Sequence, residues 1–133
     1  MSIPVSLDRL AEALTEFGPG YLMTVSGDGR VKVVTVEPTV LDGVLLVVGP
    51  GRGSVANIAA NPQVTLAFPP AEAHGFTLLV DGTASVAGDD VHVAPSGAVL
   101  HRPSAHSDGP PAPGIAAGTE SPTVRRRLPP PLR

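Results

Sequence analysis

The residues best suited to binding chemistry lie in one glycine-rich segment, Gly49-Pro50-Gly51-Arg52-Gly53-Ser54. The segment joins an aliphatic run to a stretch that is expected to be helical. The first amides of a helix lack partners within the helix, and the helix dipole adds positive charge there, so this segment predicts an anion site. Arg52 would add a guanidinium and Ser54 a hydroxyl. The alternative is that Ser54 only caps the helix while the glycines turn the chain.

The familiar catalytic constellations are absent from the sequence. There is no cysteine, which excludes a thiolate nucleophile, a disulfide and a thiolate metal site. The four histidines (His74, His92, His101 and His106) show no metal-binding spacing, and no Gly-x-Ser-x-Gly motif occurs. We therefore predict no catalytic side chain and no metal ligand, and expect any reactivity to come from a bound cofactor.

Composition and periodicity indicate one small, mainly β domain. The chain has 133 residues, of which 42% are hydrophobic and only 3% aromatic, so β-branched aliphatic residues must build the core. Apolar residues from Leu7 to Phe17 recur at helical spacing and predict an N-terminal helix that ends at Gly18-Pro19. A second, short helix is expected over residues 54–61, before Pro62.

Asp-Gly pairs between β-branched runs predict tight turns. Asp28-Gly29 and Asp42-Gly43 separate the first three runs and predict a three-stranded meander. Asp81-Gly82 predicts a bulge or bend within one long strand, and Gly88-Asp89-Asp90 predicts a further turn. The pattern favours six or seven antiparallel strands that close into a barrel, crossed by the short helix and plugged by the N-terminal one.

The two ends of the chain differ in composition. Residues 103–133 hold eight of the 16 prolines and predict a disordered tail, which leaves residues 1–102 as the folded domain. The domain carries five Lys/Arg against ten Asp/Glu, which argues against a nucleic-acid partner. Its apolar runs are too short to span a membrane, so we expect a cytoplasmic protein with no membrane partner.

Residues Gly43–Pro70 resemble the third strand, helix and fourth strand of the flavin split-barrel family, which includes pyridoxamine 5′-phosphate oxidase and the deazaflavin-dependent oxidoreductases. The matching features are the apolar strand ending at Val48, then Ser54, Asn57-Ile58 and Asn61-Pro62-x-Val64-x-Leu66. Gly82-Thr83-Ala84-x-Val86 resembles a later strand, and Asp28-Gly29-Arg30 resembles the first turn. Together these pieces cover about residues 6–102.

The resemblance implies a homodimeric, six-stranded antiparallel split β-barrel of Greek-key topology with an N-terminal helix and one short crossover helix. It also implies FMN or a deazaflavin (coenzyme F-420) in the groove between subunits, acting on a small-molecule substrate. The family holds its cofactor on the second strand, the end of the third strand and the loop before the helix. The corresponding residues here are Lys32, Val34, Thr35, Val36, Val47, Val48, Arg52, Gly53 and Ser54.

The roles implied for these residues differ. Lys32, Arg52 and the two residues Gly53-Ser54 would hold the phosphate, while the backbone of residues 34–36 would contact the ring. Asn57 would brace the helix. The choice between FMN and the deazaflavin stays open, because the polyglutamyl tail of the deazaflavin favours a basic groove and this domain is acidic.

Two departures from the family pattern leave a second function open. Glu37 replaces a basic residue of the second strand, and Gly53-Ser54 replaces an Arg-Lys pair. Each charge-assisted bond to phosphate contributes roughly 1.5–3 kcal/mol, so these departures argue against pyridoxamine-phosphate oxidase activity itself. The alternative to an oxidoreductase is a non-catalytic dimer that binds cofactor weakly or not at all, as a carrier, sensor or interaction module. A haem-binding barrel would need His74 or His101 to face the groove.

Overall fold

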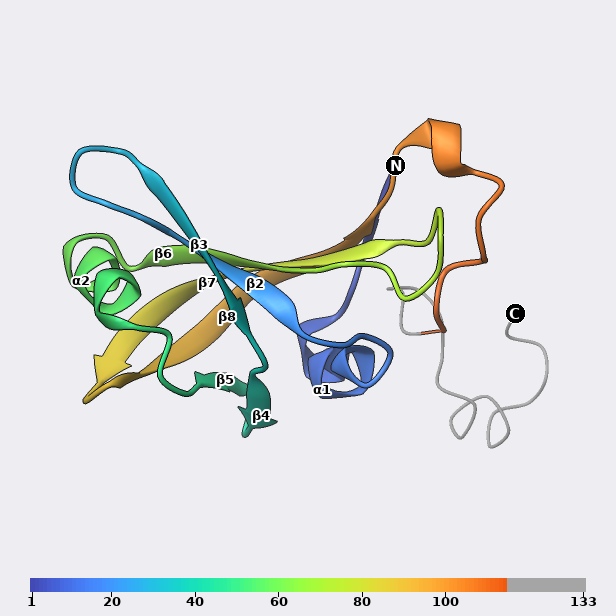
Figure 1. Ribbon diagram of the computed structural model, residues 1–133. Coiled ribbons are helices and arrows are strands. Elements are labelled where there is room, and N and C mark those ends of the chain that lie inside the picture. The colour runs from blue at the N-terminus through green and yellow to red at the C-terminus, as the bar shows by residue number, and fades with distance from the viewer. Residues whose placement is uncertain (115–133) are drawn as a thin grey trace.

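The β-branched runs form one eight-stranded antiparallel sheet in the computed structural model, which describes residues 1–114 (Figure 1). The strands are β1 (Ser2–Pro4), β2 (Gly20–Val25), β3 (Val31–Val36), β4 (Thr39–Leu41), β5 (Val44–Val47), β6 (Gln63–Phe68), β7 (Thr77–Ala87) and β8 (Asp90–His101). Their order is β3-β2-β6-β7-β8-β5-β4, with β1 paired to β8. β3 and β4 end this order, so the sheet is not closed. The predicted mainly β, split-barrel architecture is confirmed, although β1 and β4 add two short strands to the expected six.

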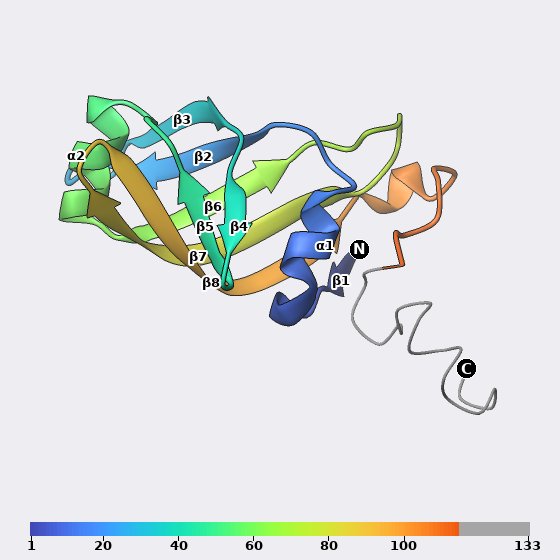
Figure 2. The same cartoon turned by 90° about the horizontal axis from the view of Figure 1, so that it is seen from below.

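The predicted helices occur at opposite ends of the sheet (Figure 2). A 3₁₀ turn, η1 (Leu7–Arg9), leads into α1 (Leu10–Leu14), and α2 (Arg52–Ala60) connects β5 to β6. Leu10 and Ala13 of α1 are buried, so the apolar stripe covers the core as expected. A short η2 (Ser104–His106) follows β8. Within residues 1–114, no helix is long and apolar enough to cross a membrane.

The predicted three-stranded meander is wrong at its middle strand. The run between the two Asp-Gly pairs, residues 30–40, forms two strands, because Glu37-Pro38 interrupts it between β3 and β4. Proline has no amide hydrogen to donate to a ladder, which favours a break at this point. The β4–β5 hairpin, which turns at Asp42-Gly43 with positive φ at both residues, therefore leaves β3 and pairs with β8. The Asp28-Gly29 hairpin forms between β2 and β3 as predicted.

The predicted irregularity at Asp81-Gly82 is confirmed as a bulge in the long β7–β8 ladder. Asp81 lies opposite Gly97 and Gly82 lies opposite Pro95, which leaves Ser96 as the extra residue on β8. The hairpin ends in the expected turn at residues 88–89, beside α2 (Figure 1).

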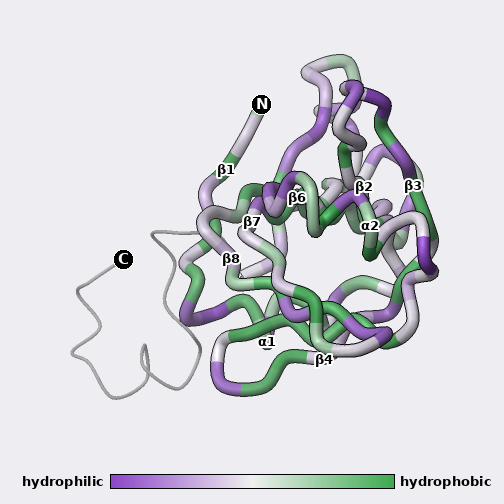
Figure 3. The backbone as a smooth tube through the Cα atoms, turned by 90° about the vertical axis from the view of Figure 1, so that its left-hand side faces the viewer, coloured by the Kyte–Doolittle hydropathy of each residue, from purple (hydrophilic) through white to green (hydrophobic). Residues whose placement is uncertain are grey.

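The core lies inside the curled sheet, as the view along its axis shows (Figure 3). Strands contribute alternate residues to it, as expected for a sheet with one face covered. The largest fully buried apolar side chains are Phe68, Leu10, Leu22, Leu45, Leu66, Leu78, Leu100, Val47, Val80, Val91 and Val93.

The chain after β8 folds back over the loop that precedes β7. Arg102 anchors this return because its side chain is buried, with its guanidinium carbon 4.0 Å from the Phe76 ring centroid. Its Nη1 donates to the carbonyl oxygens of His74 at 3.1 Å and Pro110 at 2.7 Å. A buried guanidinium with such partners holds the two segments together.

Residues 103–110 form a strap that strengthens this closure. His74 Nδ1 lies 2.8 Å from Asp108 Oδ1, and this hydrogen bond lowers the pKa of the Asp108 carboxyl. The rings of His74 and His106 stack with centroids 4.0 Å apart. Disorder was predicted from Pro103 onward, but the strap makes specific contacts that its proline-rich composition does not reveal. Residues 115–133 of the predicted tail lie outside the described residues.

A methyl group at Gly20 should disturb the core. A Cβ there would lie 2.5 Å from Phe68 Cδ1 and 2.8 Å from the Ala67 carbonyl oxygen. We expect Gly20→Ala to lower the free energy of unfolding by about 1–3 kcal/mol, measured by urea denaturation. Gly18→Ala is the matched control, since nothing lies within 4 Å of its Cβ position. Equal stability of the two variants would contradict the packing described here.

The strap should likewise depend on Gly109. A Cβ at this position would lie 2.6 Å from the His74 carbonyl carbon, and that backbone cannot give way easily. We expect Gly109→Ala to increase amide hydrogen exchange across residues 103–110, while exchange in β6 and β7 stays unchanged. Gly97→Ala, which meets nothing within 4 Å, should leave the strap protected. Unchanged exchange in Gly109→Ala would show that the strap does not close as described.

Candidate functional site

Within the described residues, three backbone amides at the start of α2 have no hydrogen-bond partner. The N-cap is Gly51, with φ of 101°, and it makes no side-chain capping bond. The first amide with a helical acceptor is that of Val55, which donates to the Gly51 oxygen at 3.1 Å. No acceptor in residues 1–114 pairs with the amides of Arg52, Gly53 or Ser54. The interpretation of Ser54 as a capping residue is therefore wrong, because it lies inside the first turn.

Ser54 adds an unpartnered hydroxyl to these amides. Its side chain is fully buried, and within the described part of the chain its Oγ has no hydrogen-bond partner. Leaving a buried polar group unpaired costs about 1–3 kcal/mol, so native structures rarely contain one without a ligand, ion or water to pair with it.

The Lys32 side chain brings a positive charge to the same place. A Cβ at Gly53 would lie 2.9 Å from Lys32 Cε and 3.3 Å from its Nζ, so the glycine leaves room for the ammonium group. The first turn of α2 contains no acidic residue. A cation beside the positive end of a helix is unfavourable by itself, and an anion shared between them removes that repulsion.

Thr24 of β2 connects the two parts of the site, the start of α2 and Lys32 on β3. It is fully buried and accepts a 3.0 Å hydrogen bond from Asn57 Nδ2, which ties α2 to the sheet. Thr24 also lies directly opposite Lys32 in the β2–β3 ladder. Asn57 thus braces the helix as expected, and the start of α2 is held at a set distance from β3.

The structure places the remaining predicted residues along β3 and at the end of β5. The side chains of Val36 and Val47 are buried in the core, and that of Val34 packs partly against it. A ligand could reach these three only through the backbone. Thr35 is exposed, and Val48 is 80% exposed. Because β3 ends the sheet order, no strand of residues 1–114 pairs with one side of its backbone, and this side can hydrogen-bond a ligand.

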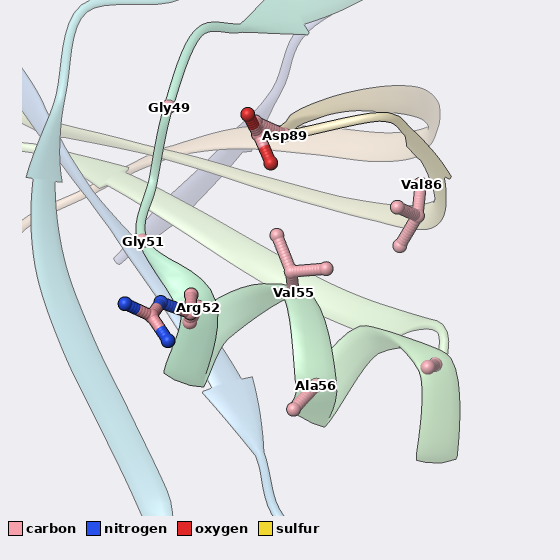
Figure 4. A pocket seen from close by; sticks show the side chains of 8 residues that line it. Gly49, Gly51, Arg52, Val55, Ala56, Val86 and Asp89 are labelled. Atoms are coloured by element: carbon pink, nitrogen blue, oxygen red, sulfur yellow. The ribbon is translucent and has the colours of Figure 1, made fainter.

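A hollow of about 710 Å³ adjoins the loop before α2 (Figure 4). Figure 4 shows Val55 facing Val86 and Asp89 across it, while the Arg52 guanidinium lies on the opposite side of the helix start. The sequence does not reveal this hollow, because its walls come from segments that are distant in the chain. The lining residues are Gly49, Gly51, Arg52, Val55, Ala56, Ala59, Val86 and Asp89.

The other residues considered from sequence lie elsewhere. Glu37 lines a separate hollow with Leu14 and Phe17, so the charge inversion is away from the start of α2. His101 is bonded to Ser2 at the far end of β8, and His74 belongs to the strap, so neither faces the hollow beside α2. Among residues 1–114, no three His, Asp or Glu side chains gather in a way that could hold a metal ion.

Relatives of known sequence match most of the chain. The uncharacterized protein Mb0449c of Mycobacterium bovis is 39% identical over 124 residues, covering 85% of this chain and 87% of the relative. The uncharacterized protein MT0457 of Mycobacterium tuberculosis matches with the same identity and coverage.

Solved structures share the fold at lower identity. An F420 reductase is 22% identical with a TM-score of 0.54, covering 65% of this chain and 94% of that one. An FAD-binding protein from Mesorhizobium loti is 14% identical with a TM-score of 0.59, covering 77% and 99%. A putative pyridoxamine 5′-phosphate oxidase from Listeria innocua is 16% identical with a TM-score of 0.57, covering 71% and 96%.

A family model described as pyridoxamine 5′-phosphate oxidase matches residues 6–112, a span that includes both helices and all strands except β1. The chain therefore belongs to the pyridoxamine 5′-phosphate oxidase family.

Proposed function

We propose that the chain is an oxidoreductase that binds a phosphorylated flavin-type cofactor, FMN or the deazaflavin coenzyme F-420, and acts on a small organic molecule. The observation that carries the proposal is the Lys32 ammonium group beside the unpartnered amides at the start of α2. This arrangement suits a phosphate, which can accept from the amides and the lysine together. The F420 reductase and the FAD-binding proteins among the similar folds support a ligand of this class.

The residues at the start of α2 would bind the phosphate. The amides of residues 52–54 and the Ser54 hydroxyl would donate to its oxygens, and Lys32 would neutralise part of its charge. Arg52, which is exposed at the helix start, would supply a second cation. These residues fit a phosphate without the Arg-Lys pair that opens the helix in the family pattern.

The edge of β3 would position the ring. Its outward backbone groups at residues 34–36 would hydrogen-bond the ring edge, and Val48 would cover part of its face. The bound cofactor supplies the hydride-transfer chemistry, and the chain orients the ring and excludes water. No side chain of the chain is assigned as a general acid or base.

The proposal includes a homodimer. Val31 and Val33 are 63% and 54% exposed, and they project from the same face of β3. Tyr21, 42% exposed, lies on the neighbouring β2 opposite Thr35. A second copy that covers this apolar face would also shield a ring lying along β3 from water.

We expect purified protein to bind FMN or coenzyme F-420 in a fluorescence titration, and Lys32→Ala and Arg52→Ala to weaken binding roughly 10- to 100-fold each. The loss should be specific for phosphate, so riboflavin affinity should change little. Arg30→Ala is the matched control, because it removes another exposed cation of the β2–β3 hairpin that carries Lys32. It should leave the affinity for FMN and coenzyme F-420 unchanged.

Two results would decide against the proposal. If the two variants lost as much affinity for riboflavin as for FMN, the start of α2 would not be the phosphate-binding site. A wild-type protein that binds neither cofactor would instead support the non-catalytic dimer, the second function that the sequence leaves open.

Ser54→Ala should weaken cofactor binding without lowering the stability of the cofactor-free protein. Removing a buried hydroxyl that has no partner should leave the free energy of unfolding of the cofactor-free protein unchanged or raise it by about 1 kcal/mol. The same change should weaken FMN or deazaflavin binding, because the phosphate loses a donor. Thermal denaturation and the fluorescence titration measure the two effects. A destabilised variant with unaltered affinity would mean that the hydroxyl serves the fold alone.

A further inference from the structure

The hollow beside α2 has the size and the lining of a binding site for a small molecule. Its volume of about 710 Å³ lies within the usual range for such sites. It opens between α2 and the tip of the β7–β8 hairpin (Figure 4). Of the two cations proposed above to bind the phosphate, Arg52 borders the hollow and Lys32 does not.

Most of the wall is apolar and small. Val55, Ala56 and Ala59 lie at i, i+1 and i+4 and so share one face of α2. Val86 faces them from β7 with 41% of its surface exposed. The two alanines leave space that a larger side chain would fill, so a compact hydrocarbon group can pack against this wall.

One carboxylate faces this apolar wall without a partner. Within residues 1–114, Asp89 makes no hydrogen bond or ion pair, and Figure 4 shows its side chain directed toward Val55. The neighbouring Asp90 is already engaged, because its Oδ1 accepts the Gly49 amide at 2.9 Å. Asp89 is exposed at the hairpin turn, and the Arg52 guanidinium, although Arg52 also borders the hollow, extends away from Asp89 and does not pair with it.

We propose that this hollow binds a small organic cation, an amine that carries a compact apolar group and no phosphate. The ammonium would pair with Asp89, and the apolar group would pack between Val55, Ala59 and Val86. This site adjoins the proposed phosphate site, because Gly51 and Arg52 border both, but binding of the amine needs no cofactor.

Three probes of similar size test the charge preference: benzylamine, benzyl alcohol and benzoate. In titrations of the full chain without cofactor, followed by NMR chemical shifts, benzylamine should bind about 3- to 10-fold more tightly than benzyl alcohol. Benzoate should bind weakest of the three. Asp89→Asn should abolish the preference for benzylamine while benzyl alcohol still binds.

Two further variants separate the pocket from its charge. Asp42→Asn is the control for charge, because it removes a carboxylate at the tip of the β4–β5 hairpin that does not line the hollow. This variant should still prefer benzylamine to benzyl alcohol. Ala59→Phe fills the hollow from an exposed helix position and should remove binding of all three probes. An unchanged preference in Asp89→Asn, or retained binding in Ala59→Phe, would overturn the proposal. Because no flavin is present, loss of the proposed cofactor function would not affect either result.

Discussion

The position of the start of α2 against β3 is the constraint on which the candidate site depends. The lysine ammonium is positively charged and the N–H ends of the three unpaired amides carry partial positive charge, so their approach is unfavourable unless the fold holds them together. The sheet fixes Lys32 opposite Thr24, and the hydrogen bond from Asn57 to Thr24 fixes the helix to the same residue. The free energy of folding therefore offsets the repulsion between Lys32 and the start of α2, and an anion binds to groups that are already in place.

The open edge of the sheet supplies the rest of the site. A closed barrel would pair both sides of every strand, whereas β3 keeps one side of its backbone free next to the helix start. The same opening leaves exposed valines on an edge strand, which is a liability for aggregation. A ligand bound along the edge of β3 and a second copy packed on the valines would cover these exposed groups and lower the tendency to aggregate. The open edge would in this way couple ligand binding to dimer formation.

Local signals in the sequence predicted the local features of this fold. The Asp28-Gly29 hairpin, the bulge at Asp81-Gly82 and the helix before Pro62 follow from turn chemistry and periodicity alone. The same signals could not predict that the β4–β5 hairpin pairs with β8 and not with β3. A turn determines which two strands it connects, but it does not determine which other strand of the sheet they pair with. The strap was missed because its order comes from Arg102, whose contacts lie far away in sequence.

The candidate site shows the same division. The glycine-rich segment could be identified from residue type and from the family resemblance, and Lys32 from the resemblance alone. The burial of Ser54 and the meeting of Asp89 with Ala59 could not, because each depends on how α2 packs against distant strands.

The extra residue at the bulge shifts the phase of β8. Before it, the odd-numbered Val91 and Val93 face the core, and after it the even-numbered Ala98 and Leu100 do. β8 therefore runs as one strand and still presents apolar side chains to the core on both sides of the bulge. If the ladder ran through Ser96 without a bulge, regular alternation would turn Ala98 and Leu100 toward water, so the bulge keeps both pairs in the core despite the odd spacing between them.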